Sequence, residues 1–121
     1  MDVLLIQLHG EARAIPAGMV QGIISLGNLT PVPTAPPEVL GIVEWQGQVV
    51  PVVDLGREDN ADSRVRIGAP LVVIDWPVGR TRGVVALLVE RVGSVQPAHE
   101  ASARPLDVES LLEALRQRTS A

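Results

Sequence analysis

The sequence of 121 residues contains no cysteine, no lysine, no phenylalanine and no tyrosine, and its two tryptophans are its only aromatic residues. The absence of cysteine excludes disulfides and thiolate metal sites. The core must therefore be built from valine, leucine, isoleucine and alanine, and the β-branched members of that set favour strands. Hydrophobic residues make up 46% of the chain, a share typical of a globular protein.

Charge and hydropathy exclude further classes of protein. Ten basic and 14 acidic residues give a net charge of −4, whereas a nucleic-acid-binding protein usually needs a basic face to neutralise phosphates. The first residues lack the basic start and the longer apolar run of a signal peptide. No window approaches the ~18 to 20 apolar residues of a membrane-spanning helix. We therefore expect a cytoplasmic protein without direct membrane insertion.

Short apolar segments between glycine, proline and polar residues predict an all-β fold. The expected strands are 3–8, 11–16, 39–45, 49–55, 71–76, 83–89 and 92–95. Residues 20–26 fit either a strand or one helical turn. Four prolines within residues 28–37 predict an extended surface connector, and Pro51 predicts an edge position or a bulge because it removes one ladder hydrogen bond. Residues 56–64 and 77–82 are expected to be loops.

A helix is predicted at about residues 107–118, at the end of this single domain of residues 1–121. Val108, Leu111, Leu112 and Leu115 lie at helical spacing on one face. Asp107 is expected to be the N-cap. We expect the apolar face of this helix to pack against the strands.

Few polar groups are arranged for catalysis. The sequence has no GxSxG, no phosphate-binding loop and no GxGxxG. Asp54, Asp75 and Glu90 lie near predicted strand ends, where catalytic acids can occur, and they define the alternative of a small enzyme on a barrel. The simpler interpretation is that they are solvated charges, so we predict no catalytic residue, no cofactor and no metal site.

Four segments resemble the CheW family of chemotaxis adaptors. They are Ile15-Pro16 with residues 20–24, the proline-rich residues 29–37, the segment GIVEWQGQVVPVVDL at residues 41–55, and residues 87–95. The resemblance implies two small SH3-like β-barrels packed around a shared apolar core. It also implies an adaptor at cytoplasmic chemosensory arrays, which couples the tip of a chemoreceptor (a methyl-accepting chemotaxis protein) to a CheA-type histidine kinase.

The resemblance also implies site residues and two altered positions. A groove near Val20, Ile23 and Gly41 is expected to bind the receptor. The family pattern has Glu where this chain has Gly22, and Leu-Arg where it has Trp45-Gln46. A charge pair has thus lost both members, which can be nearly neutral for folding. Gly22, Trp45 and Gln46 are therefore candidates for an altered kinase contact.

The chain is also shorter than the family pattern. Only residues 96–104 separate the segment ending at Val95 from the final LDVESLL at residues 106–112, where family members carry several tens of residues. One barrel is therefore expected to be reduced. Short CheW proteins of the myxobacterial Frz gliding-motility system are similar. We expect an adaptor that binds chemoreceptors with kinase coupling weakened or lost; the alternative is an ordinary CheW scaffold, and other CheW-like proteins are further possible partners.

Overall fold

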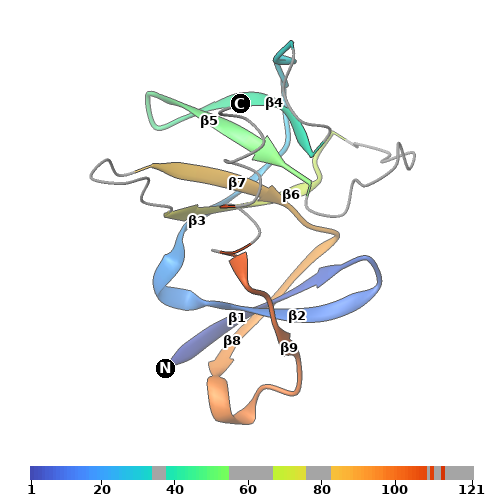
Figure 1. Cartoon of the computed structure of the whole chain (residues 1–121), viewed down its shortest axis with the longest axis vertical. Helices are drawn as coiled ribbons and strands as arrows, with labels where there is room; N and C mark the ends of the chain where they lie inside the picture. Colours follow the sequence, from blue (N-terminus) through green and yellow to red (C-terminus); the bar gives the residue numbers. More distant parts are fainter. Residues whose placement is uncertain (34–37, 55–66, 76–82, 109, 111–112, 114–121) are drawn as a thin grey trace.

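The computed structural model describes residues 1–33, 38–54, 67–75, 83–108, 110 and 113, and strands dominate this part of the chain (Figure 1). The strands are β1 (Asp2–Leu8), β2 (Glu11–Pro16), β3 (Val20–Ser25), β4 (Val39–Trp45), β5 (Gln48–Val53), β6 (Pro70–Asp75), β7 (Val84–Leu88), β8 (Arg91–Pro97) and β9 (Arg104–Pro105). Two short 3-10 helices follow β2 and β8, namely η1 (Ala17–Met19) and η2 (Ala98–Glu100). The all-β prediction is confirmed.

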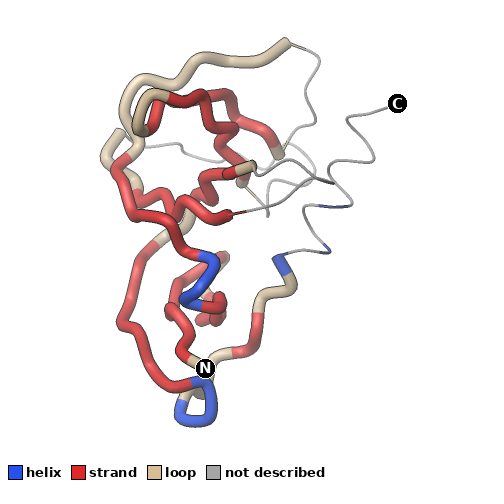
Figure 2. Tube along the Cα trace, turned by 90° about the vertical axis from the view of Figure 1, so that its left-hand side faces the viewer, coloured by secondary structure: helices blue, strands red, loops and turns tan. Residues whose placement is uncertain are grey.

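The strands form two sheets. The smaller has the order β8-β1-β2-β9, and the larger has the order β3-β6-β7-β5-β4. The smaller sheet occupies the lower half of the molecule in Figure 1, and the side view of Figure 2 shows the same separation. Because β9 contains only two residues, the smaller sheet is the reduced subdomain that the short spacing near the C-terminus predicted.

Two tight turns set the register of the local hairpins. His9 and Gly10 join β1 to β2 with φ angles of 54° and 73°, and Gln46 and Gly47 join β4 to β5 with φ angles of 49° and 78°. Two consecutive residues with positive φ match the right-handed twist of the flanking strands. Both hairpins were predicted, although the second turn is one residue shorter than expected because Gln48 already belongs to β5.

Pro51 was expected at an edge position or a bulge, and the edge position is wrong because β5 lies between β7 and β4. A register shift does occur nearby, between Val39 and Gly41 on β4, opposite Val53 and Val52. The N–H and the carbonyl oxygen of Ile42, the partner of Pro51 on β4, both bond to Thr30 instead of β5. Ile42 and Pro51 are therefore a non-hydrogen-bonded pair, in which the missing N–H costs no ladder bond. On the other side, pairing with β7 begins only at Val52. An interior strand thus accommodates the proline.

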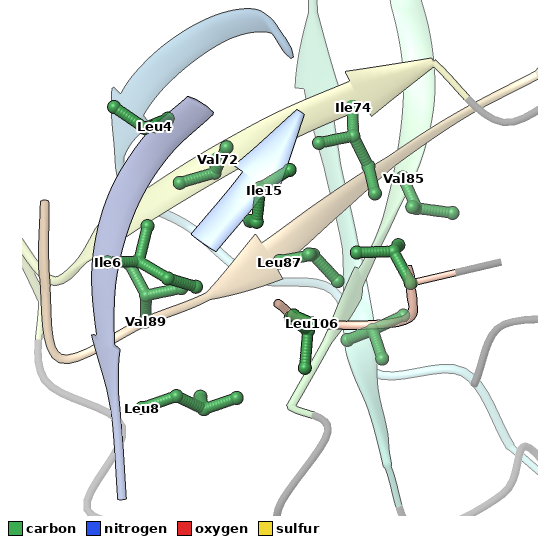
Figure 3. Close-up of a cluster of buried hydrophobic side chains, with 12 residues drawn as sticks. Leu4, Ile6, Leu8, Ile15, Val72, Ile74, Val85, Leu87, Val89 and Leu106 are labelled. Atoms are coloured by element: carbon green, nitrogen blue, oxygen red, sulfur yellow. The ribbon is translucent and has the colours of Figure 1, made fainter. Parts of the chain in front are cut away.

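A shared apolar cluster packs the two sheets against each other (Figure 3). The smaller sheet contributes Leu4, Ile6, Leu8 and Ile15, and the larger sheet contributes Val53, Val72, Ile74, Val85 and Leu87, with Val89, Leu106 and Val108 completing the cluster. A second cluster lies within the larger sheet and includes Leu26, Leu40, Val43, Val50, Val52, Leu71, Val73 and Ala86. The buried members of both clusters in the described residues are therefore all aliphatic, and Trp45 packs against the second cluster from its partly buried position.

The short strand β9 is held against β2 by main-chain and guanidinium contacts. Leu106 N–H donates to the Ala14 carbonyl oxygen (2.9 Å). The Arg13 guanidinium donates to the carbonyl oxygens of Arg104 (3.3 Å) and Pro105 (3.0 Å). Because β9 runs parallel to β2, these contacts direct the following residues toward the shared core, where Leu106 is buried.

The predicted helix at residues 107–118 lies mostly outside the described residues. Val108, Ser110 and Glu113 are described and are helical. Asp107 is the N-cap as predicted, because its Oδ1 accepts a hydrogen bond from the Ser110 N–H (3.2 Å). Residues 56–64 and 77–82, expected to be loops, and residues 34–37 of the proline-rich connector also lie outside the described part.

The Asp107 cap predicts a pH dependence. The hydrogen bond from the Ser110 N–H lowers the pKa of the Asp107 carboxyl from its ordinary value of 3.8. A lowered pKa in the folded state stabilises the fold above the unfolded-state pKa, and that contribution is lost as the pH falls through the lowered value. Asp107→Ala is therefore expected to be less stable than the parent chain at neutral pH. The difference should shrink on acidification.

Thermal unfolding at a series of pH values measures this difference. Asp107→Asn keeps a side-chain acceptor without the titrating charge, so its stability should show no contribution from position 107 that changes with pH. If Asp107→Ala and the parent chain remain separated by the same difference down to pH values well below 3.8, the carboxylate is not the source of the stabilisation.

Candidate protein-binding site

The two outer strands of the larger sheet, β3 and β4, approach each other along a line that we call the seam. The seam runs between residues 22–30 on one side and residues 41–45 on the other. One end of it is closed by two hydrogen bonds: Thr30 N–H donates to the Ile42 carbonyl oxygen (3.0 Å), and Ile42 N–H donates to the Thr30 carbonyl oxygen (2.8 Å). The larger sheet therefore curls toward a closed barrel.

The other end of the seam is closed by a side-chain contact between Gly22 and Trp45. A Cβ atom placed on Gly22 would lie 3.3 Å from Cζ2 and 3.6 Å from Nε1 of Trp45. Both residues are half-buried. The indole therefore packs directly against the glycine backbone, and a larger side chain at position 22 would compete with it for space.

The three candidates for an altered kinase contact are neighbours in space. Gly22 contacts Trp45 across the seam, and Gln46 follows at the exposed turn. Sequence reasoning treated the change as the loss of an acid–arginine pair. It did not predict that the tryptophan fills the space beside the glycine. The signal for such a contact was present in the sequence, because a small residue and a large residue occur where the family pattern has a charged pair.

Val20, Ile23 and Gly41, the candidates for the receptor groove, have different surroundings. Val20 is half-buried against the shared core, while the side chain of Ile23 is 50% exposed. Val20 and Ile23 point to opposite faces, because the inward positions of β3 are 20, 22 and 24. Gly41 is buried, and its Cβ position is occupied by the backbone of Thr30. Of the three candidates, Ile23 is therefore the most exposed.

Two of the three acidic residues of the enzyme alternative, Glu90 and Asp54, form hydrogen bonds that support the fold. The Glu90 carboxylate accepts a hydrogen bond from the Gly10 N–H (2.6 Å) and so supports the turn between β1 and β2. The Asp54 residue is buried, and its N–H donates to the Glu38 carbonyl oxygen (2.7 Å). Both residues thus contribute to connections between strands.

Asp75, the third of these acids, lies at the opposite end of β7 from Asp54. Asp75 pairs with Val84 at the start of that strand, whereas Asp54 follows the residue that pairs with Leu87. Three residues of strand correspond to about 10 Å. The structure therefore separates Asp75 from Asp54. The part of the chain that it describes contains no group of three or more His, Cys, Asp or Glu residues placed to hold a metal ion.

The contact between Gly22 and Trp45 predicts the effect of restoring the acid of the family pattern. Gly22→Glu should displace the indole and lower the free energy of unfolding by about 1–3 kcal/mol, the cost of overpacking. In a Trp76→Phe background, the emission of Trp45 should shift to longer wavelength because the ring enters water. Tryptophan fluorescence and denaturant unfolding measure the two effects.

A second substitution tests whether the indole is the cause. Adding Trp45→Leu to Gly22→Glu should recover most of the lost stability, because the smaller side chain leaves room for the carboxylate. Emission of the Gly22→Glu variant at the parental wavelength would contradict the contact.

Comparisons with known proteins identify the fold and the family of the chain. A search of curated proteins found no match. Among solved structures, the chain is similar to the crystal structure of the scaffolding protein TtCheW from Thermoanaerobacter tengcongensis, with a TM-score of 0.67 and 21% sequence identity. The similarity covers 82% of this chain and 62% of that chain, so this chain spans about three-fifths of its length. At this identity the likeness shows the fold. In the described residues no helix is long and apolar enough to cross a membrane. A scan of protein families matches the CheW-like domain over residues 2–117, and the chain therefore belongs to the CheW-like domain family.

Proposed function

We propose that this chain is a non-enzymatic adaptor of a bacterial chemosensory system, which binds chemoreceptors and has weakened or lost coupling to a CheA-type kinase. Members of the family act as scaffolding adaptors, and this supports the general assignment. The observation that carries the specific proposal is the packing of Trp45 on Gly22. We place the protein in the cytoplasm, at chemosensory arrays of the gliding-motility type, as a single domain.

The charge at the end of the seam supports the loss of kinase coupling. Gln46 occupies the position of the family's arginine, at an exposed turn where a partner's carboxylate would find no cation. Position 22 has lost the acid that would orient such an arginine, and the indole of Trp45 packs against Gly22. A partner that binds the acid–arginine pair of the family pattern would place its own charged group against this chain without an opposite charge. An unpaired charge is costly at a buried interface.

The smaller sheet supports the same conclusion independently. Its outer strand β9 has two residues, and only residues 98–103 connect β8 to it. A barrel end with so little strand offers a small surface, whereas stable interfaces bury about 800 Å² on each partner. The larger sheet keeps all five strands, and Ile23 on its outer strand is exposed for a receptor contact.

Binding measurements with purified components test the proposal. We expect the chain to bind a chemoreceptor cytoplasmic fragment at micromolar concentration. We expect it to bind the regulatory domain of the cognate kinase more weakly than an ordinary CheW paralogue does, by about tenfold or more. Isothermal titration calorimetry with both partners measures these affinities.

A triple substitution provides the matched control. Gly22→Glu with Gln46→Arg restores the charge pair, and Trp45→Leu makes room for it. This variant should bind the kinase more tightly than the parent chain and the receptor fragment equally well. Kinase binding by the parent chain as tight as that of the paralogue would instead favour the ordinary scaffold, and failure to bind any receptor fragment would reject the adaptor role.

A further inference from the structure

The strand β8 forms one edge of the smaller sheet, because it pairs only with β1 in the described part of the chain. Figure 2 shows β8 on the outer side of the lower half of the molecule, where it leads into η2. Gly93, Ser94 and Val95 are exposed. An unpaired strand edge is a template for pairing with another chain, so the direction of its main-chain groups decides what it can bind.

Hydrogen bonds near both ends of β1 show which of its residues bond to the β8 side. Ala98 N–H donates to the Met1 carbonyl oxygen (2.8 Å), and Glu90 N–H donates to the Gln7 carbonyl oxygen (2.9 Å). Main-chain groups alternate in direction along a strand, so the odd-numbered residues of β1 bond toward β8. The even-numbered residues bond toward β2, on the other side of β1.

The residues of β8 that lie opposite even-numbered residues of β1 therefore point their main-chain groups to the free edge. Val92 pairs with Ile6 and Val95 pairs with Leu4, and these are non-hydrogen-bonded pairs. The two valines are three positions apart, but a register shift between Leu4 and Ile6 gives both the same orientation. The free edge thus presents the N–H and carbonyl groups of Val92 and Val95, separated by about 7 Å, the length of two residues of β1.

The side chains of the same two valines lie on the face of the sheet that packs in the shared cluster. Paired residues share a face, and both Leu4 and Ile6 belong to that cluster. Val92 is half-buried against it, but Val95 is 58% exposed. An apolar side chain on the core face is exposed here because, among the described residues, no strand lies beyond β8. A valine from an added strand would cover it.

The sequence of this edge is complementary to itself. After Arg91, β8 carries no charged side chain, whereas charges are a common means by which proteins protect exposed edges. When two copies of β8 run antiparallel with Val92 opposite Val95 of the second copy, symmetry forms the valine pair twice. In that register Arg91 lies opposite Gln96 of the second copy, so no like charges face each other. Pro97 has no N–H to donate, so the pairing ends before it.

We propose that β8 pairs with β8 of a second copy of this chain, about a two-fold axis beside Gly93 and Ser94, so that the two smaller sheets become one continuous sheet. Val92 N–H donates to the Val95 carbonyl oxygen of the second copy, Val95 N–H donates to the Val92 carbonyl oxygen, and symmetry repeats both bonds. A two-fold interface requires a surface that complements itself, as this edge does. A single pair of short strands is smaller than the ~800 Å² per partner of stable interfaces, so the dimer forms at millimolar concentration. The inference is independent of receptor and kinase binding.

Sedimentation velocity and nuclear magnetic resonance of the full chain test the proposal, over a range from micromolar to millimolar concentration. The average mass should rise from that of the monomer toward that of the dimer, and the amide signals of Val92 and Val95 should shift with the same concentration dependence. In an equimolar mixture of isotope-labelled and unlabelled chain, nuclear Overhauser contacts should join the methyl groups of Val92 in one copy to those of Val95 in the other. A chain that stays monomeric at millimolar concentration, or a dimer whose contacts lie elsewhere, would overturn the proposal and leave this edge to a different polypeptide.

Two valine variants of similar exposure locate the contact. Val95→Lys places a charge at the edge, as natural edge strands do, and should weaken dimerisation by about tenfold or more because symmetry removes both valine pairs. Val49→Lys adds the same charge on β5 of the larger sheet, where the side chain is 64% exposed, and should leave dimerisation unchanged. Both variants should unfold near the parental midpoint, because each replaced side chain is mostly exposed. Equal dimerisation by the two variants would show that the edge of β8 is not the interface.

Discussion

Replacing Gly41 with alanine is expected to lower the free energy of unfolding by about 3–5 kcal/mol. Gly41 is buried at a bulge of β4 and has a φ of 156°, which residues with side chains rarely adopt. A Cβ atom there would lie 2.9 Å from the carbonyl carbon of Thr30 and 3.0 Å from Cγ of Leu29. The clash is with backbone, so relief requires the segment at Thr30 to move away from β4.

That movement would break the two hydrogen bonds between Thr30 and Ile42 that close the seam. The expected loss combines the cost of overpacking, about 1–3 kcal/mol, with about 1 kcal/mol for each bond. Chemical denaturation measures the change as a shift of the midpoint at constant m value. Gly27→Ala is the matched control, because a Cβ atom at Gly27 would meet nothing within 4 Å. Equal stability of the Gly41→Ala variant and the parent chain would show that the segment at Thr30 is not fixed.

Ile74→Ala is expected to cost about 2–5 kcal/mol, the range for deleting a fully buried aliphatic side chain. Ile74 has no exposed surface and lies on β6, between β3 and β7. It belongs to the shared cluster, in which residues of the smaller sheet pack against the larger one (Figure 3). The resulting cavity would therefore weaken the packing between the sheets as well as the larger sheet itself.

The design of this second experiment uses another isoleucine and two probes. Ile23→Ala removes the same atoms from the neighbouring strand, but half of its side chain is exposed, so the loss should stay below about 1 kcal/mol. Fluorescence of Trp45 follows the larger sheet, and amide exchange in β1 follows the smaller one. Both should report the same destabilisation in Ile74→Ala. Different values from the two probes would mean that the sheets unfold separately.

Local patterns predicted most of the strands, because their signals lie within a few residues. The hairpin of β1 and β2 follows from apolar segments on either side of His9-Gly10, and the hairpin of β4 and β5 follows from Gly47. Pairings between distant segments could not be predicted in this way. The parallel pairing of β9 with β2 joins residues about ninety positions apart, and the pattern of β9 is too short to carry a signal.

The candidate site also was predicted only in part: its residues were identified from the sequence, but their contact was not. Departures from the family pattern identified Gly22, Trp45 and Gln46, because a missing charge is visible in the sequence alone. That the indole packs on the glycine depends on the curl of a five-stranded sheet, which no local pattern specifies. Pro51 was misplaced for a related reason: its tolerance inside the sheet depends on Thr30, which takes both main-chain bonds of Ile42.

The strand order of the smaller sheet has a consequence for synthesis on the ribosome. Its hairpin β1–β2 ends at Pro16, but its other strands begin at Arg91 and Arg104. At about 5–20 residues per second, the 74 residues between Pro16 and Arg91 take about 4–15 s to translate. During that interval the apolar face of the hairpin has none of its flanking strands. Completion of this sheet is therefore a late event with high contact order, and nascent chains expose Leu4 and Ile6 to chaperones.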